Sequence, residues 1–350
     1  MELDLYAHGD RLWEKDFLAS YRLDVRLFEA LGLEIRQIVP GRTSYRITTD
    51  KGMFCLKKLR FKLEEMNFVI QAAEHLKNNG FDCVFDIIWQ DDGSFLYEFN
   101  HDKYYLTQWI DGKENDFLNP MDLYMAVDTL VQFHNCSCGF VPDNLPENRD
   151  YLGKWIESFK LKLFEIMDIK QTILGRCTES SFKREYIRNV ESIISEAEEA
   201  VSLIDVDVYQ QAVDAARRQK SFIHHDFGHN NIIHTFDGRT YLQDLDFCVL
   251  DLRIHDLGSF ILRCMKKSNW DVDKAFHIID CYNDKKPLSR DELKLLVPFL
   301  LFPQDFWQLT KQYCKDLTKC DSSEYMEKVS RKIEYASLRK RFIDEFARKL

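Results

Sequence analysis

The chain has 350 residues, of which 45% are hydrophobic and 30% charged, and its 58 acidic side chains outnumber its 48 basic ones. This composition excludes a disordered chain and predicts a folded protein with room for two lobes that share a cleft. The formal net charge of −10 argues against nucleic acid as a partner. The longest uninterrupted apolar stretch, residues 295–302, is too short to span a membrane. The amino terminus lacks the basic-then-apolar order of a secretory signal, so we expect a cytoplasmic protein.

Strand signals dominate residues 34–110. Residues 34–59 contain two β-rich runs, separated by the turn signal Thr-Asp-Lys-Gly. Further strands are expected at 83–90, 94–100 and 103–110. Residues 64–80 instead place their apolar side chains at helical spacing and end at a glycine. This part of the chain therefore predicts a small antiparallel sheet with one helix.

Beyond residue 112 the pattern becomes helical. Helical spacing of apolar residues is found at 121–135, 151–169, 182–204, 208–219 and 331–350. Strand signals return only at 221–234 and 239–250, around polar clusters. We therefore expect an α+β fold of two lobes, with the antiparallel sheet in the first and mainly helices in the second. The expected bounds are 1–106 for the first lobe, 107–111 for the hinge and 112–350 for the second lobe, with the polar loop region 222–247 inside it.

The densest cluster of ionisable and amide side chains lies in that loop region. It comprises His224, His225, Asp226, His229, Asn231, Asp244 and Asp246. If the flanking segments are short strands, carboxylate and amide oxygens can converge there on one hard cation such as Mg²⁺. A second interpretation is a metal hydrolase that binds a transition metal through His224, Asp226 and His229, although no HExxH motif is present. A third is purely structural, with turn and cap hydrogen bonds and packed imidazoles.

The spacing within this cluster sharpens the first interpretation. Asp226 follows His224 by two residues and precedes Asn231 by five, and Asp244 comes eighteen residues after Asp226. This order resembles the catalytic loop and the second metal-binding Asp of protein kinases and of the aminoglycoside phosphotransferase and choline kinase superfamily. In those proteins the first Asp positions and deprotonates the attacking hydroxyl, and the Asn and the later Asp bind magnesium. The resemblance implies Asp226 as the catalytic residue and Asn231 and Asp244 as Mg²⁺ ligands.

The same resemblance implies an ATP site in the first lobe. A lysine on the third strand should reach the α- and β-phosphates, and Lys57 fits that place, with Lys58 on the opposite face of the strand. A glutamate at the start of the following helix should hold this lysine. Of Glu64 and Glu65, both in the first turn, we favour Glu65.

Two further segments would complete the nucleotide site. The loop at residues 40–44 would cover the phosphates, with Arg42 and Ser44 as contacts, but it has one glycine where protein kinases have three. The backbone from Gln108 to Ile110 would meet the edge of the adenine.

Several longer segments are similar to the CotS-type spore coat proteins of endospore-forming Firmicutes. They include KGMFCLKKLR, YYLTQWIDGKE, IHHDFGHNNI and DLDFCVLDLRIHDLG. The similarity implies expression in the mother cell and deposition on the spore coat with other coat proteins. Because the four polar residues at 57, 226, 231 and 244 are all present, we expect an ATP- and Mg²⁺-dependent phosphotransferase that acts on the hydroxyl of a small molecule. The alternative is a catalytically weak or inactive kinase-like protein with a structural role in the coat.

The sequence leaves the acceptor open among an amino sugar, choline, homoserine, another sugar and a protein hydroxyl. Its pocket is expected among the helices after residue 257, where Trp270, Trp307 and Tyr313 are available, although such aromatic residues more often fill a core. The acidic net charge favours a cationic alcohol without locating its site.

Overall fold

The computed structural model describes residues 23, 25–41, 44–175, 181–315 and 323–350. The chain divides into two compact units. Unit 1 consists of Met1–Glu114, Pro142–Asn144 and Asn231–Asp246, and unit 2 consists of Asn115–Val141, Leu145–Asn230 and Phe247–Leu350. Within the described residues, no helix is long and apolar enough to cross a membrane.

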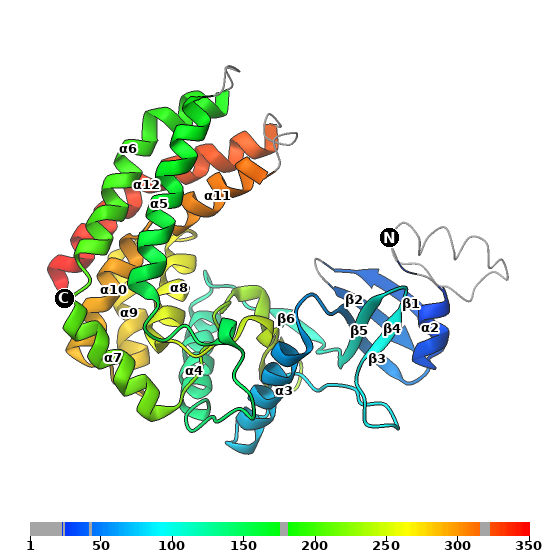
Figure 1. Cartoon of the computed structure of the whole chain (residues 1–350). Coiled ribbons are helices and arrows are strands. Elements are labelled where there is room, and N and C mark those ends of the chain that lie inside the picture. The colour runs from blue at the N-terminus through cyan, green and yellow to red at the C-terminus, as the bar shows by residue number, and fades with distance from the viewer. Residues whose placement is uncertain (1–22, 24, 42–43, 176–180, 316–322) are drawn as a thin grey trace. The chain divides into compact units, whose positions relative to one another are not determined.

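An antiparallel five-stranded sheet forms the centre of unit 1 (Figure 1). Its strands are β1 (Ile35–Pro40), β2 (Ser44–Thr49), β3 (Gly52–Lys58), β4 (Tyr97–Phe99) and β5 (Asp102–Gln108). Their order in the sheet is β1-β2-β3-β5-β4. The hairpin from β2 to β3 turns at the expected signal, where Gly52 has a φ of 128° that residues with a side chain rarely adopt.

The described residues of the amino-terminal part of unit 1 form two helices, α2 (Val25–Leu31) and α3 (Leu63–Asn78). Leu27 of α2 belongs to the same buried cluster as Leu56 and Leu106 of the sheet. Met66 of α3 instead packs with Tyr105. Because neighbouring residues of a strand point to opposite faces, α2 and α3 cover opposite faces of the sheet around β5.

The expected strand at residues 83–90 is wrong. Only one isolated bridge joins this segment to β5, between Ile87 and Thr107. The backbone carbonyl groups that a regular strand would use have other partners: Cys83 O accepts the backbone N–H of Leu242, and Phe85 O accepts the ammonium of Lys77. Competing hydrogen bonds from a helix and a second sheet therefore replace regular pairing.

That second sheet has three short antiparallel strands, β6 (Gly112–Glu114), β7 (Ile232–Thr235) and β8 (Thr240–Leu242), in the order β6-β7-β8. The pairing of β6 with β7 attaches residues 231–246 to unit 1. Gly112 permits the close approach, because a Cβ atom there would lie 2.4 Å from the backbone oxygen of His234.

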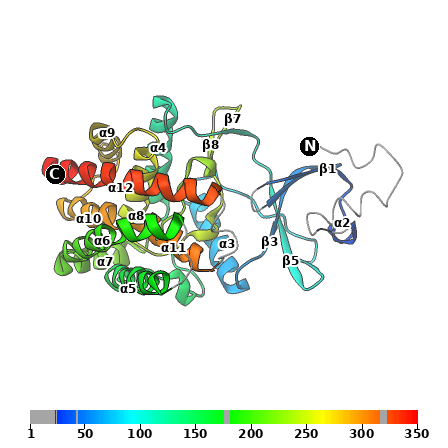
Figure 2. The ribbon, with the colours of Figure 1, turned by 90° about the horizontal axis from the view of Figure 1, so that it is seen from above.

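Unit 2 is helical. Its helices are α4 (Pro120–Cys136), α5 (Trp155–Leu174), α6 (Ser181–Ser202), α7 (Val206–Gln219), α8 (Arg253–Met265), α9 (Val272–Asn283), α10 (Arg290–Leu301), α11 (Gln304–Lys315) and α12 (Ser323–Lys349). Helix α10 packs against α8, α6 and α12 (Figure 2). The buried face of α5 continues into a core shared with α6 and α11. A sheet-containing first part followed by helices confirms the expected α+β class.

Candidate active site

Four side chains of unit 1 form a partly buried polar group, which we call the Lys57 cluster: Lys57, Tyr105, Asp244 and Asp246. The Nζ atom of Lys57 lies 2.6 Å from Oδ1 of Asp244 and 3.3 Å from Oδ2 of Asp246. The hydroxyl of Tyr105 donates to Asp246 at 3.2 Å. The structure thus brings two predicted site residues, Lys57 and Asp244, into direct contact although 187 residues separate them.

The sheet determines which way Lys57 points. In the paired strands Lys57 lies opposite Ser44 of β2 and Tyr105 of β5, and cross-strand neighbours share one face of a sheet. The next residue, Lys58, points to the other face, where its ammonium pairs with exposed Asp102 at 2.6 Å. Strand alternation alone therefore separates a lysine in the cluster from a lysine at the surface.

The electrostatics of the cluster favour bound positive charge. Burial opposes the charge on Lys57, but Tyr105 and the carboxylates of Asp246 and Asp244 outweigh it, so the pKa of Lys57 lies above its ordinary value. Burial and the neighbouring Asp244 raise the pKa of Asp246, against the effect of Lys57. Two adjacent carboxylates with one ammonium carry a net negative charge that a hard cation could share, and their oxygen atoms suit Mg²⁺.

Asn231 ends a short 3₁₀ turn, His229–Asn231, immediately before β7. It is buried, and its backbone oxygen accepts the N–H of Gln243 at 2.9 Å. Because β7 and β8 pair between Ile232 and Leu242, Asn231 and Asp244 lie near the same end of the hairpin. Asp244 has a φ of 66°, a conformation that is uncommon without glycine and occurs at functional sites.

Asp226 belongs to unit 2, in a segment that we call the Asp226 loop (residues 224–230). Buried Asp256 of α8 anchors this loop by accepting the backbone N–H groups of His224 at 2.7 Å and His225 at 2.8 Å. Burial alone would raise the pKa of Asp256, but the hydrogen bond from His134 and the nearby imidazoles outweigh it and bring the pKa to about 2. A buried carboxylate therefore fixes the backbone from which Asp226 projects.

Arg263 of α8 is the ion-pair partner of Asp226. Its Nη2 atom donates to Oδ1 of Asp226 at 2.5 Å, and both side chains are only about one-third exposed, at 38% and 34%. The guanidinium also lies over Gly228, where a Cβ atom would be 2.6 Å from Nη1. A glycine in this loop thus leaves room for the arginine that orients the carboxylate.

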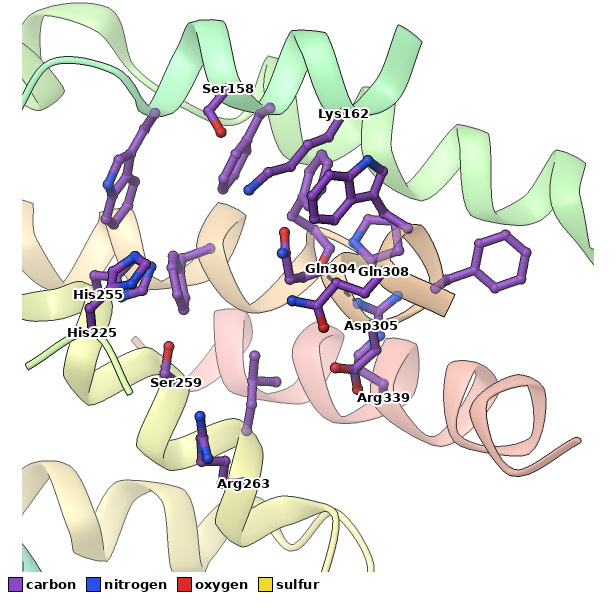
Figure 3. A pocket seen from close by; sticks show the side chains of 18 of the residues that line it. Ser158, Lys162, His225, His255, Ser259, Arg263, Gln304, Asp305, Gln308 and Arg339 are labelled. Atoms are coloured by element: carbon purple, nitrogen blue, oxygen red, sulfur yellow. Dashed lines mark hydrogen bonds between the residues drawn. The ribbon is translucent and has the colours of Figure 1, made fainter. Parts of the chain in front are cut away.

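A cavity of about 750 Å³ lies beside Asp226 within unit 2. Figure 3 shows it between α5 on one side and α8 on another, with Lys162, Ser259, Gln304 and Gln308 directed toward it. Two aromatic residues named from the sequence, Trp270 and Trp307, line this cavity. The side chain of Tyr313 lies outside the described part of the chain.

Of the other residues predicted to contact the nucleotide, Ser44 lies on the same face of the sheet as Lys57, whereas Glu65 has a different partner. The carboxylate of Glu65 accepts the backbone N–H of Lys62 in a helix cap, while Lys57 pairs with Asp244 and Asp246 instead. Ser44 lies on the Lys57 face of the sheet. Arg42 falls outside the described residues.

The expected hinge, residues 107–111, begins in the last two residues of β5 and continues beyond the strand. The backbone N–H of Gln108 donates to Asp86 at 3.1 Å, and that of Trp109 donates to Met53 at 3.1 Å. Gln108 and Ile110 line a smaller cavity of about 270 Å³. Ile110 lies beyond the end of the strand, so its backbone is not part of the sheet ladder.

The transition-metal interpretation finds no support in the geometry. Nδ1 of His224 accepts the backbone N–H of Asp226 at 3.2 Å, and the ring of His229 packs edge-on against Phe117. No group of three or more His, Cys, Asp or Glu side chains suited to a metal ion occurs in the part of the chain that the structure describes.

Three residues of these sites were not assigned a role from the sequence. Asp246 stands two residues after Asp244, and both carboxylates pair with Lys57. Two aspartates spaced two residues apart are a sequence pattern from which a role for Asp246 in the site could be predicted. Arg263 has no local signal, because its partner lies 37 residues earlier in the chain. Lys162 interrupts an apolar face of α5, which is a signal that periodicity could have found.

The family model described as "Spore coat putative kinase YutH" matches residues 25–346. Spore coat protein S of Bacillus subtilis (strain 168) is 25% identical over 285 residues, which cover 81% of this chain and 80% of that relative.

Solved structures share the fold at low identity. An aminoglycoside phosphotransferase from Alicyclobacillus acidocaldarius has a TM-score of 0.75 and 17% identity, with 90% of this chain and 92% of that chain covered. Spectinomycin phosphotransferase APH(9)-Ia, in complex with ADP and spectinomycin, has a TM-score of 0.63 and 16% identity, with 90% and 98% covered. Amicoumacin kinase hAmiN, in complex with AMP-PNP, Ca²⁺ and Ami, has a TM-score of 0.59 and 14% identity, with 95% and 96% covered.

Proposed function

The chain belongs to the spore coat kinase family whose model it matches over residues 25–346, and on that premise we propose that it is an ATP- and Mg²⁺-dependent phosphotransferase acting on a small-molecule hydroxyl. The observation that carries the proposal is the contact of Lys57 with Asp244 at 2.6 Å. It joins the third strand to the segment after β8, the two places where a phosphate-binding lysine and a metal-binding aspartate belong.

In this proposal unit 1 holds the nucleotide. Lys57 would contact the α- and β-phosphates, and Ser44, on the same face of the sheet, would donate a hydrogen bond to a phosphate oxygen. Asn231 and Asp244 would supply amide and carboxylate oxygens to Mg²⁺. When bound, that ion would neutralise charge on the transferring phosphoryl group. Ile110 would offer its backbone to the adenine, and Glu65 would steady Lys57.

Unit 2 supplies the base and the acceptor site in this proposal. The carboxylate of Asp226 would accept the hydroxyl proton as the acceptor oxygen bonds to the γ-phosphorus and ADP leaves. Arg263 is proposed as a positioning residue, because its hydrogen bond to Oδ1 limits the orientations open to that carboxylate. The anchoring of the loop by Asp256 supports this role, since catalysis needs the base at a defined place.

One observation favours the second candidate, a catalytically weak kinase-like structural protein of the spore coat. The ion pair with Arg263 engages an oxygen of Asp226 that a base would use. Spore coat protein S, the relative reported above, is named for the coat and not for an activity. For either candidate we propose the mother cell and the spore coat as the location, and other coat proteins as partners.

The first test is the affinity for ATP, measured by calorimetry with and without Mg²⁺. Lys57→Met should weaken binding at least about tenfold, because hydrogen bonds to charged groups are worth about 1.5–3 kcal/mol. Lys58→Met is the matched control, since it removes the neighbouring lysine, whose exposed side chain points to the opposite face of the sheet. Wild-type protein that binds no ATP, or equal affinities for both variants, would overturn the nucleotide site.

A further inference from the structure

Lys162 is a charged residue at a position where helix α5 is otherwise apolar. The buried residues of α5 are Trp155, Phe159, Ile166, Ile169 and Ile173, and Lys162 takes the place between Phe159 and Ile166. Its ammonium lies 5.1 Å from the ring centroid of Trp307, and 5.9 and 6.0 Å from those of Phe159 and Phe302. Burial lowers the pKa of Lys162 to about 8, opposed by Asp251 and Glu165, so the side chain is still mostly charged at pH 7.

No carboxylate or carbonyl partner engages this ammonium within the residues that the structure describes. The other cations around the cavity are all engaged. Arg263 pairs with Asp226, Lys266 with Asp305, Arg339 with Glu196, and Lys154 donates to the backbone oxygen of Glu147. Lys162 is therefore the cation of this cavity, among the described residues, that still lacks an oxygen partner.

The nearest carboxylates are already committed to other donors. Both oxygens of Asp251 accept the indole N–H of Trp155, at 2.9 and 3.0 Å, and Oδ1 also accepts the N–H of Leu252. Glu165 is held by Lys311 at 2.9 Å and by the indole of Trp307. The charge of Lys162 thus faces the cavity without a carboxylate of the described chain to neutralise it.

The rest of the lining suits a polyhydroxylated ring. Hydroxyl and amide side chains point toward the cavity from α5, α8 and α11, as Figure 3 shows: Ser158, Ser259, Gln304 and Gln308. Two further lining atoms, Nδ1 of His255 and Nε1 of Trp270, are buried without a hydrogen-bond partner in the described structure. The walls carry Trp155, Phe159, Phe299 and Trp307, whose rings can cover the apolar face of a sugar.

From these observations we infer that the cavity beside Asp226 binds an anionic sugar, with its carboxylate or phosphate on Lys162 and its hydroxyl groups on the uncommitted polar side chains. A cationic amino sugar or choline would meet an unneutralised ammonium instead, so the charge of this cavity argues against the cationic acceptor that the net charge of the chain favours. The inference rests on the proposed function in one respect, that the bound sugar is the phosphoryl acceptor.

The test measures sugar binding to the full chain by calorimetry, without nucleotide. Glucuronate, glucose and glucosamine share one ring and differ in charge, and glucose 6-phosphate tests the other anion. We expect one of the two anions to bind about tenfold or more tightly than glucose, with glucosamine weakest. Lys162→Met should abolish that preference, Lys162→Arg should keep it, and Lys160→Met, on the exposed side of the same helix, should leave it unchanged.

Several outcomes would overturn the inference. They are equal binding of glucose and both anions, tighter binding of glucosamine, persistence of the anion preference in a folded Lys162→Met variant, and no binding of any of the four sugars at millimolar concentration. Because no nucleotide is present, these outcomes are separate from failure of the phosphotransferase itself. A protein that binds glucuronate but never phosphorylates it would contradict the proposed function and leave the anion site standing.

Discussion

The Lys57 cluster of unit 1 and the Asp226 loop of unit 2 are held in place by different interactions. In the cluster, side chains pair with side chains: one ammonium lies between two carboxylates at 2.6 and 3.3 Å. In the loop, a buried carboxylate accepts backbone N–H groups at 2.7 and 2.8 Å. Ion pairs between side chains can exchange partners when a ligand enters, whereas a backbone held by a buried charge cannot move without loss of stability.

Mutations in the two regions should therefore affect different properties, ligand affinity in one and folding stability in the other. Changes in the Lys57 cluster should alter ligand affinity more than folding, because its side chains remain 16–26% exposed. Changes at Asp256 should alter folding first, because the residue is fully buried. Asp226 lies on the rigid loop but is itself one-third exposed, so its substitution should affect chemistry alone.

The largest expected effect is therefore on phosphoryl transfer. Asp226→Asn should lower the rate with an accepted sugar by about 10²–10⁴-fold, because it removes a general base. ATP affinity should not change, since Asp226 is not part of the Lys57 cluster. Rates from radiolabelled ATP and affinities from calorimetry check both statements, and a variant that retains the wild-type rate would assign Asp226 a structural role.

Asp256→Ala should reduce the free energy of unfolding by about 3 kcal/mol, because two buried backbone N–H groups and His134 lose their acceptor. Urea denaturation measures this change. The control is Asp128→Ala, which removes a partly exposed ion pair with Lys285 and should cost less than about 1 kcal/mol. Equal losses in the two variants would remove the basis for calling the Asp226 loop rigid.

The pH dependence of stability sharpens the same point. The pKa of Asp256 is about 2, below the value of about 3.9 expected in the unfolded chain, so its charge stabilises the folded state above pH ~4. That contribution, about 2.5 kcal/mol for a difference of this size, should be lost as the pH falls from about 4 through 2. Denaturation of wild type and Asp256→Asn across this range should show their stabilities converging, and a constant gap would contradict the assignment.

The smallest of the expected effects concerns Lys162. Its pKa is about 8, so raising the pH from 7 to 9 removes most of its charge and should weaken glucuronate binding by about tenfold. Bound anion opposes deprotonation, which shifts the decline to higher pH without changing its direction. The groups that also act on this lysine are Asp251, Glu165 and Lys311. Burial raises the pKa of Asp251 to about 8, so this residue gains negative charge over the same pH range and adds to the decline. Lys162→Met should show a smaller decline, which comes from Asp251. A wild-type affinity that stays constant to pH 9 would contradict the anion site.

The sequence indicates the elements of the fold better than it indicates their exceptions. Alternation around Lys57 and helical spacing after residue 112 reflect burial, which is a local pattern. The segment 83–90 is rich in apolar residues that favour a strand, but hydrogen bonds from Lys77 and Leu242 direct its backbone elsewhere, and Leu242 lies far away in the sequence. The periodicity of a segment does not show which distant residues will form hydrogen bonds with its backbone, so it could not predict this exception.

The residues of the candidate sites also fall into two groups, those that local spacing indicates and those that depend on tertiary packing. The spacing of Asp226, Asn231 and Asp244 carries chemical information, because a fixed loop needs those side chains at fixed intervals. The position of Arg263 and the charge that the cavity presents to an acceptor depend on which helices meet. The net charge of the chain favours a cationic ligand, whereas the place of Lys162 in the apolar face of α5 is the local signal behind the anionic ligand that we propose.

The most direct measurement is calorimetric titration with ATP in the presence of Mg²⁺ for wild type, Asp244→Ala and Asp102→Ala. Asp244 belongs to the Lys57 cluster, whereas Asp102 pairs with Lys58 on the opposite face of the sheet. We predict Mg²⁺-dependent binding in wild type and Asp102→Ala, and its loss in a folded Asp244→Ala variant. Mg²⁺-dependent binding that survives in Asp244→Ala, or its absence from folded wild type, would contradict the nucleotide and metal site on which the proposed activity depends.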